Sequence, residues 1–306
     1  MDSISRATEA ARIKLPSIEC RYDEPMKNHT SFRIGGPLRA MFIPRNAEEL
    51  IGLCKLLRGC GIVPLIIGNG TNLLVGDSRP LEMVAIKTTG IDHAERTGKN
   101  EITAGAGISL SKLATFACEC GLSGLECAHG IPGSLGGAVA MNAGAYGMEM
   151  KDVIYSTDGY GNGTGIYTLT AEEHDFSYRR SRFSDTGDIV VSSVIRLRKG
   201  DRENIREKMD ELFEDRSKNQ PLELPSAGSA FKRPKDGYAA SLIENAGLKG
   251  FSVGGAQVSK KHAGFIVNTG GASFSDVMAV IEYVRETVFR QTGVDLEPEI
   301  RIVNCG

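Results

Sequence analysis

The chain has 306 residues, more than one hydrophobic core usually organises, so its length predicts two or three subdomains. Its 36 basic and 38 acidic residues leave a net charge of -2, which argues against a protein that binds nucleic acid or a membrane surface through bulk charge. Any anionic ligand must therefore be held by a local cluster of cations.

The N-terminal residues and the cysteines suggest in which cellular compartment the protein works. Residues 1–16 lack the apolar segment of a signal peptide, and no apolar run approaches the roughly 20 residues of a membrane span. The cysteines are odd in number and form no C-x-x-C pair, which favours reduced thiols in the cytoplasm. They are Cys20, Cys54, Cys60, Cys118, Cys120, Cys127 and Cys305.

The first half of the chain alternates helical and strand patterns. Apolar residues at 50, 51, 54 and 57 predict a helix over 46–59, capped by Asn46 and ended by the turn at 59–61. A buried strand is expected at 63–68, and a second helix at 109–120, capped by Ser109. The segments MVAIKT, EITAG and IVVSSVIRLR are typical of strands.

Residues 201–219 have apolar residues at 205, 209, 212 and 213, which predicts an amphipathic helix leading into a second domain. We place the domain boundary near residue 200. A long helix is expected from about 273 to 291, and the closing LEPEIRIV, residues 296–303, is strand-like.

Two glycine-rich stretches are candidates for binding loops. In GNGTN, residues 68–72, successive backbone N–H groups can form a nest for a phosphate, although the same five residues also suit an ordinary turn. GNGTN matches neither a Rossmann fingerprint nor a P-loop. The longer GIPGSLGGAVAMNAGAYG, residues 130–147, has more glycines than a turn needs. Together the two stretches suggest a bound dinucleotide.

Three other motifs give weaker support for a particular function. GFSVG, residues 250–254, is spelled like a hydrolase elbow, but no acid lies between Ser252 and His262, so the triad order fails. The histidines lack metal-ligand spacing, and the Cys118-x-Cys120 pair, which could ligate a metal, lies in an expected helix without partner ligands, so we expect no metal. In FSYRRSRF, residues 176–183, the arginines suit either a solvated strand face or a bidentate grip on a carboxylate.

Seven segments in order resemble the family of UDP-N-acetylenolpyruvoylglucosamine reductases, and the match covers almost the whole chain. They are NHTSFRIGG, GNGTNLLV, GIPGSLGGAVAMNAGAYG, FSYRRSRF, PSAGSAFKRP, KHAGFIVN and LEPEIRIV. The resemblance implies an α+β fold. A two-part FAD-binding domain of the vanillyl-alcohol-oxidase (PCMH) type would occupy residues 1–200, with subdomains at about 1–90 and 91–200. An α/β substrate-binding domain would follow at 201–306, with its last strand returning to the active site.

The resemblance also implies a non-covalent FAD cofactor, with NADPH as reductant. The flavin pyrophosphate loop matches residues 68–72, and the second flavin run matches residues 131–145. The implied cofactor contacts are Thr30, Arg33, Gly68, Asn69, Gly70, Thr71, Asn72, Leu73, Ile131, Gly133, Ser134, Gly136, Gly137, Asn142 and Ala145.

The catalytic positions of the family match Arg179, Ser229 and Glu299. The implied reaction reduces the enolpyruvyl ether of UDP-N-acetylglucosamine enolpyruvate to UDP-N-acetylmuramate, for peptidoglycan synthesis. A fixed cation and a protonated carboxyl suit the charge that develops on the substrate carboxylate, and Ser229 would protonate C2. The expected substrate contacts are Tyr146, Tyr178, Arg216, Lys218, Lys232 and Arg233, although each of the last four also suits a solvated surface charge.

Two departures from the larger members of the family are evident. The chain passes directly from FSYRRSRF to DIVVSSVIRLR, so it resembles a shorter subclass without the tyrosine-bearing insertion that covers the substrate. Arg233 in FKRP stands where one large form has asparagine. Two other functions remain open: another FAD oxidoreductase acting on an alcohol or sugar, with a covalent tether at His129 or Cys127, and a nucleotide-sugar binding protein without chemistry.

Overall fold

The computed structural model describes residues 2–161 and 163–304, so Cys305 lies outside the described residues. Two compact units are distinguished. The first comprises residues 1–21, 40–69 and 83–214, and the second comprises residues 22–39, 70–82 and 215–306. Two N-terminal segments are thus grouped with the C-terminal residues. The assignment of residues 1–200 to FAD and 201–306 to substrate stays a prediction.

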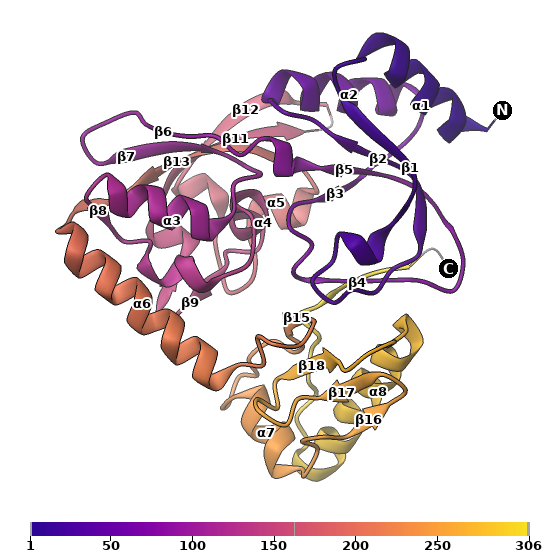
Figure 1. Cartoon of the computed structure of the whole chain (residues 1–306), viewed down its shortest axis with the longest axis vertical. Helices are drawn as coiled ribbons and strands as arrows, with labels where there is room; N and C mark the ends of the chain where they lie inside the picture. The colour runs from indigo at the N-terminus through magenta and orange to yellow at the C-terminus, as the bar shows by residue number, and fades with distance from the viewer. Residues whose placement is uncertain (1, 162, 305–306) are drawn as a thin grey trace. The chain divides into compact units, whose positions relative to one another are not determined.

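In the first unit, helices α1 (Ser3–Lys14) and α2 (Ala47–Gly59) lie side by side (Figure 1). The predicted cap is confirmed, because the Asn46 side chain accepts a hydrogen bond from the Glu49 amide at 2.9 Å. Buried apolar residues of both helices share one core cluster. A four-stranded sheet has the order β1-β2-β5-β3, formed by β1 (Glu19–Pro25), β2 (Pro37–Ile43), β5 (Leu81–Lys87) and β3 (Leu65–Ile67). Strands β1, β2 and β5 each contain residues of both units, whereas β3 lies in the first.

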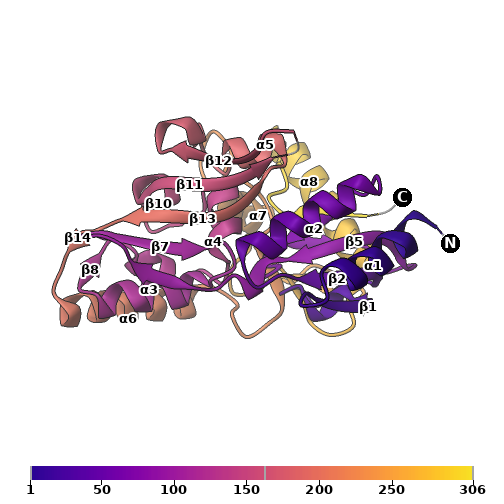
Figure 2. The same cartoon turned by 90° about the horizontal axis from the view of Figure 1, so that it is seen from above.

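The five-stranded sheet, which lies wholly in the first unit, has the order β12-β11-β13-β7-β6, with antiparallel neighbours throughout. Its strands β7, β13, β11 and β12 are labelled in Figure 2. Helices α3 (Leu110–Glu119) and α4 (Leu135–Ala140) share its apolar core, and Ser109 caps α3 as predicted. The strands are β12 (Gly165–Thr170), β11 (Ile154–Gly161), β13 (Ile189–Arg196), β7 (Glu101–Gly105) and β6 (Ala94–Arg96).

Short elements complete the first unit and its connections. Two-stranded pairs are formed by β8 (Leu122–Ser123) with β14 (Arg198–Lys199) and by β9 (Gly144–Ala145) with β10 (Met148–Glu149). The 3₁₀ turns are η1 (Met26–Asn28), in the second unit, and η2 (Thr88–Gly90), η3 (Glu126–Gly130), η4 (Met150–Asp152) and η5 (Glu172–His174), in the first.

The FSYRRSRF segment is not a strand, so the solvated-strand interpretation is wrong. Its first part is a tight turn in which Ser177 and Arg180 pair with each other, and α5 (Arg182–Thr186) follows directly. The chain turns because Arg179 has a positive φ of 55° and because Ser181 caps α5.

Helix α6 (Arg202–Asn219) confirms the predicted helix but has a narrower buried stripe. Ile205 and Met209 are buried, whereas Phe213 is 46% exposed. The division between the units falls inside this helix, after Glu214.

The second unit contains the antiparallel sheet β15-β18-β17-β16 and the helices α7 (Ala239–Asn245) and α8 (Phe274–Thr292) (Figure 1). Residues of α8 such as Val280 and Val284 are fully buried against this sheet. The strands are β15 (Ser226–Ser229), β18 (Phe265–Asn268), β17 (Ala256–Val258) and β16 (Ser252–Val253).

The predicted closing strand is shorter than expected. Only β19 (Arg301–Val303) is a strand, and it pairs in parallel with β4 (Leu73–Val75). Upstream, Pro298 forms an isolated bridge with Phe231, in which the Lys232 amide donates to the Glu297 carbonyl and the Glu299 amide to the Ala230 carbonyl. Among residues 2–161 and 163–304, none of the helices combines the length and apolar character that crossing a membrane requires.

Helix α8 begins with a reciprocal cap that can be tested. Ser273 Oγ accepts from the Asp276 amide at 3.2 Å, and the Asp276 carboxylate accepts from the Ser273 amide at 2.9 Å. Removing the hydroxyl in Ser273→Ala should lower the free energy of unfolding by about 1 kcal/mol, measured by urea denaturation. Ser273→Thr keeps the oxygen and should stay within a few tenths of that value; equal stability of the alanine variant would contradict the cap.

Candidate functional site

The first half of the GNGTN loop packs against the second glycine-rich run, and both lie in the first unit. A methyl group added at Gly68 would lie 1.9 Å from the Ser134 hydroxyl oxygen. Asn69 Nδ2 donates to the Pro132 carbonyl at 2.9 Å. The two segments that the sequence predicted to hold a flavin nucleotide are therefore in direct contact, 63 residues apart in the chain.

The second half of the loop packs against the NHTSF segment of the second unit. Gly70 has a φ of 65°, and a methyl group there would lie 1.9 Å from the His29 carbonyl oxygen. The Ser31 amide donates to the Gly70 carbonyl at 3.1 Å. Contact within the chain thus already requires glycine at position 70.

Ser134 provides the observation that points to a ligand. The residue is 2% exposed, and its hydroxyl has no hydrogen-bond partner among the described residues. A buried hydroxyl without a partner costs about 1–3 kcal/mol, which a bound polar group would recover. Neighbouring Gly137 is exposed, and Ile131, Gly133 and Gly136 are half-buried. This run fits the phosphate or ring edge of a nucleotide cofactor.

The remaining residues predicted to contact the cofactor differ in burial and in local structure. Thr30 is buried and its hydroxyl donates to the Ile34 carbonyl at 3.0 Å, while Arg33, with a φ of 56°, is exposed. Thr71 is half-buried and Leu73 begins β4, whereas Ala145 ends β9.

Ser229 and Glu299 are brought together within the second unit. The Glu299 amide donates to the Ala230 carbonyl at 2.9 Å, so Glu299 lies on the chain beside the residue that follows Ser229. Asn72 Nδ2 donates to the Glu299 carbonyl at 3.1 Å, and the Arg301 amide donates to the Asn72 carbonyl at 3.0 Å. Ser229 is exposed and Glu299 is half-buried. The backbone segments that carry Ser229 and Glu299 thus lie side by side, next to the end of the GNGTN loop.

Arg179 lies in the first unit, on the turn that precedes α5. Its guanidinium carbon lies 5.0 Å from the centroid of the Tyr178 ring, a cation–π distance, and Tyr178 is 46% exposed. Tyr146 is 45% exposed.

Backbone strain concentrates at the predicted site. In the described part of the chain, six non-glycine residues have a positive φ. Four of the six are predicted site residues, namely Arg33, Asn142, Tyr146 and Arg179. Such conformations cost of order 1–3 kcal/mol each and recur where function needs a particular side-chain direction.

The predicted pyrophosphate cations have structural partners of their own. Lys232 Nζ lies 2.5 Å from Glu297, and the Arg233 guanidinium carbon lies 4.2 Å from the centroid of the Tyr238 ring. Arg216 and Lys218 stand in the last turn of α6, where cations also complement the helix dipole. The geometry therefore does not single out any of the four for a substrate.

The structure does not support the alternative sites that the sequence left open, namely a thiol tether, a hydrolase-like histidine and a metal site. Burial raises the pKa of the Cys127 thiol, which disfavours a nucleophilic thiolate. The His262 ring packs edge-on against Phe265, and its Nδ1 accepts from the Gly264 amide at 3.2 Å. Within the described ranges, no group of three or more His, Cys, Asp and Glu side chains could hold a metal ion.

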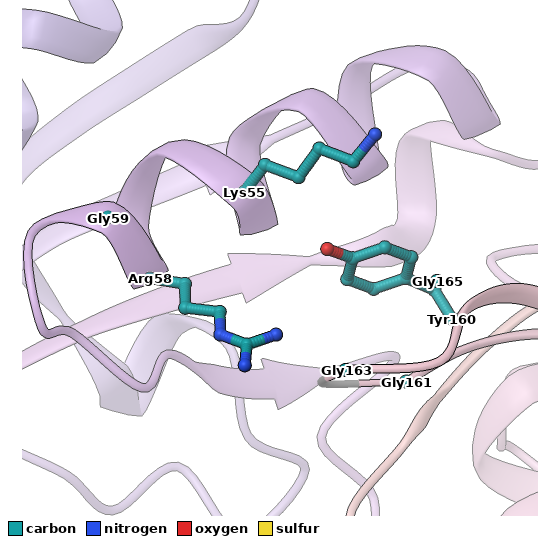
Figure 3. Close-up of a pocket in the computed structure, with 7 residues that line it drawn as sticks. All are labelled: Lys55, Arg58, Gly59, Tyr160, Gly161, Gly163 and Gly165. Carbon is teal, nitrogen blue, oxygen red and sulfur yellow. The ribbon is translucent and has the colours of Figure 1, made fainter.

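A surface pocket of the first unit lies apart from the predicted residues. Figure 3 shows Arg58 and Tyr160 reaching into a space lined also by Gly161, Gly163 and Gly165, with Lys55 on the same helix as Arg58. None of the predicted site residues lines this pocket, so the candidate site is defined by the converging segments instead.

Sequence reasoning missed two residues that organise the second unit. Ser31 Oγ donates to the Ser226 carbonyl at 2.6 Å, and Asn268 Nδ2 donates to the Phe32 carbonyl at 3.1 Å. Both tie the NHTSF segment to strands of the C-terminal sheet. The available signal was a polar residue inside NHTSFRIGG and KHAGFIVN, two of the segments that carried the resemblance.

Comparisons with known proteins agree with this arrangement. Residues 220–303 match the family profile of the C-terminal domain of UDP-N-acetylenolpyruvoylglucosamine reductase. Residues 38–158 match the profile of an FAD binding domain. The predicted fold class, a FAD-binding part followed by a C-terminal domain, is confirmed.

Individual relatives extend the likeness over the whole chain. A UDP-N-acetylenolpyruvoylglucosamine reductase of Caldanaerobacter subterraneus subsp. tengcongensis is 49% identical over 92% of this chain and 92% of its own. The crystal structure of such a reductase from Thermus caldophilus is 33% identical, with a TM-score of 0.79 over 94% of this chain and 98% of its own. An alkyldihydroxyacetonephosphate synthase, 17% identical, shares the fold over 64% of this chain and 40% of its own, with a TM-score of 0.51.

The need for glycine at position 70 can be measured. Gly70→Ala would force a side chain into a positive-φ conformation against a backbone carbonyl, so the free energy of unfolding should fall by about 1–3 kcal/mol or more. Gly59→Ala, where a methyl group meets nothing within 4 Å, is the matched control and should not destabilise. Both values follow from denaturant titration; a Gly70→Ala variant as stable as the control would contradict the close approach.

His174 is fully buried between aromatic rings, with its Nδ1 2.6 Å from the Thr170 carbonyl and its ring centroid 4.6 Å from that of Phe176. Since a carbonyl only accepts, Nδ1 carries the proton. Nε2 has no partner among the described residues. Burial lowers the pKa of His174, and that of His262, below the ordinary value of about 6.5.

Stability should therefore fall on acidification. The unfolded chain binds the proton more readily than the folded one, so unfolding free energy decreases as pH drops below about 6.5, by at most ~1.4 kcal/mol per pH unit for each such histidine. His174→Asn, whose amide can take the place of Nδ1–H, should flatten this dependence between pH 7 and 5. Denaturant titrations at several pH values would measure it, and an unchanged slope would show that His174 does not contribute.

Proposed function

This chain belongs to the UDP-N-acetylenolpyruvoylglucosamine reductase family, and from that membership we propose that Arg179, Ser229 and Glu299 carry its reaction. The enzyme reduces UDP-N-acetylglucosamine enolpyruvate to UDP-N-acetylmuramate, a peptidoglycan precursor, with FAD as cofactor and NADPH as reductant. The chemistry that bound FAD would supply is hydride transfer from NADPH to C3 of the enolpyruvyl ether.

The residues assigned to FAD fit such a group. In the first unit, the Ser134 hydroxyl would donate to a phosphate oxygen, beside the N–H groups of Gly68, Asn69 and Gly137. The Gly136 amide already donates to the Ala106 carbonyl at 2.8 Å, so it would contribute close backbone approach and no hydrogen bond. In the second unit, Thr30 and residues 70–73 would supply further contacts.

One observation carries the catalytic proposal: the bond from the Glu299 amide to the Ala230 carbonyl, which places Glu299 beside the Ser229 segment. Hydride addition at C3 drives negative charge from C2 onto the substrate carboxylate. A protonated Glu299 would donate a hydrogen bond to that carboxylate, and Arg179 would bind it through its fork of N–H donors. The charge is then stabilised where it develops.

Ser229 would complete the reduction by giving its hydroxyl proton to C2. A hydroxyl is a weak acid, but the enolic carbon is a strong base, so positioning is the main requirement. Ser229 is exposed at the end of β15, next to Gly228 with a φ of 78°. The serine oxygen is left as an alkoxide that must regain a proton from solvent or a neighbouring group.

Substrate contacts remain part of the proposal. Tyr146, itself at a positive φ, and Tyr178, next to Arg179, are exposed aromatic residues. The cations proposed for the substrate pyrophosphate are Arg216, Lys218, Lys232 and Arg233. We also propose that the chain is of the shorter subclass, and that it works in the cytoplasm, where NADPH and nucleotide sugars are available. A flavin tether through Cys127 is not favoured, because burial raises the pKa of its thiol.

The proposal predicts separable half-reactions in anaerobic stopped-flow experiments. Ser229→Ala should slow reoxidation of the reduced flavin by UDP-N-acetylglucosamine enolpyruvate at least ~10²-fold, because the proton donor is gone, while reduction by NADPH changes less than about twofold. Glu299→Gln should also slow reoxidation selectively.

Ser226→Ala, at the other end of the same strand, is the control and should behave as wild type. Equal losses in both half-reactions of Ser229→Ala would make the serine structural. Failure of the substrate to reoxidise the wild-type flavin would defeat the function itself.

A further inference from the structure

Asn142 is buried, and its side-chain amide forms its hydrogen bonds within the chain. Its side chain is 0% exposed. Nδ2 donates to Glu149 Oε2 and to the Ser177 carbonyl, both at 3.0 Å, and Oδ1 accepts from the Lys151 amide at 3.0 Å. An asparagine amide has only two N–H donors, so neither remains for a ligand. The sequence predicted that Asn142 contacts the flavin, but its side chain has no N–H left to donate to such a ligand.

The bond to the Ser177 carbonyl reaches the turn that bears Arg179. Ser177 and Arg180 close this turn by exchanging backbone hydrogen bonds at 3.1 and 3.2 Å. A second anchor comes from the same segment as Asn142, because Ser181 Oγ donates to the Ala140 carbonyl at 2.7 Å. Residues 140–142 thus hold the turn on both sides of Arg179.

The turn needs such anchors because of its backbone. Arg179 has a φ of 55°, and an arginine gains nothing from this conformation to offset its cost of about 1–2 kcal/mol. Asn142 has a φ of 45°, which asparagine tolerates better than most residues. Its rigid, buried amide can therefore fix the carbonyl two residues before Arg179.

We propose that Asn142 is a positioning residue, which holds the Arg179 turn so that the guanidinium is presented to the substrate carboxylate. The inference rests on the proposed function of Arg179. Misplacement of a reacting or binding group by about 1 Å can cost ~10²-fold in rate, so the effect should appear in the half-reaction that uses the carboxylate.

The test uses the FAD-loaded enzyme and two substitutions. Asn142→Gly accepts the positive φ and removes the amide; Asn142→Asp keeps the size but removes both donors. Each should slow flavin reoxidation by UDP-N-acetylglucosamine enolpyruvate roughly 10- to 100-fold, with NADPH reduction and the FAD dissociation constant within about threefold. Asp23→Gly, at an exposed positive-φ residue of the second unit, is the matched control and should leave all three unchanged.

A double-mutant cycle separates positioning from direct contact. In an Arg179→Ala background, Asn142→Gly should slow reoxidation by less than about twofold more, because the group it positions is absent. The same slowing in both backgrounds, or a weakened affinity for FAD, would overturn the proposal. If Arg179→Ala slows reoxidation but Asn142→Gly does not, only this inference fails; if Arg179→Ala has no effect, the proposed role of Arg179 fails first.

Discussion

The close approach of backbone and side chains at residues 68–72 is the constraint on which the candidate site depends. Gly68 leaves no room for a side chain beside Ser134, and Gly70 leaves none beside the His29 carbonyl. Asn72 then bonds to the Glu299 carbonyl. Residues of this one loop therefore contact three other segments: Gly68 contacts the second glycine-rich run, Gly70 contacts the NHTSF segment, and Asn72 contacts the C-terminal segment. A larger residue at position 70 would disturb the second unit before it could affect any ligand.

The same loop shows how stability and function share residues. The glycines of a phosphate-binding loop are usually explained by the ligand, yet here the folded chain alone requires them at both positions. The unsatisfied Ser134 hydroxyl and the strained Arg179 backbone are of another kind, because neither stabilises the fold. Features that cost free energy without stabilising the fold therefore indicate a binding site better than the glycines do.

The pattern of elements was largely predictable, since helix caps and apolar periodicity are local. Asn46 and Ser109 cap helices as the sequence predicts, and the helix expected from about residue 273 begins after its cap at Ser273. Errors arose where a local pattern has two outcomes: FSYRRSRF forms a turn instead of a strand, and the apolar stripe of α6 leaves Phe213 exposed. Burial depends on which neighbours arrive, and a single segment does not encode them.

The sequence by itself determined the family, because seven ordered segments are specific without any knowledge of their spacing, and it determined the residue types available for a nucleotide, a carboxylate and a proton. Only the tertiary structure decided how they are supported. It placed Glu299 beside the Ser229 segment across 70 residues of chain, and it turned the Asn142 amide toward Ser177. Hydrogen bonds between distant segments exist only after the chain has folded, so a residue's neighbours, unlike its chemistry, had to be read from the structure.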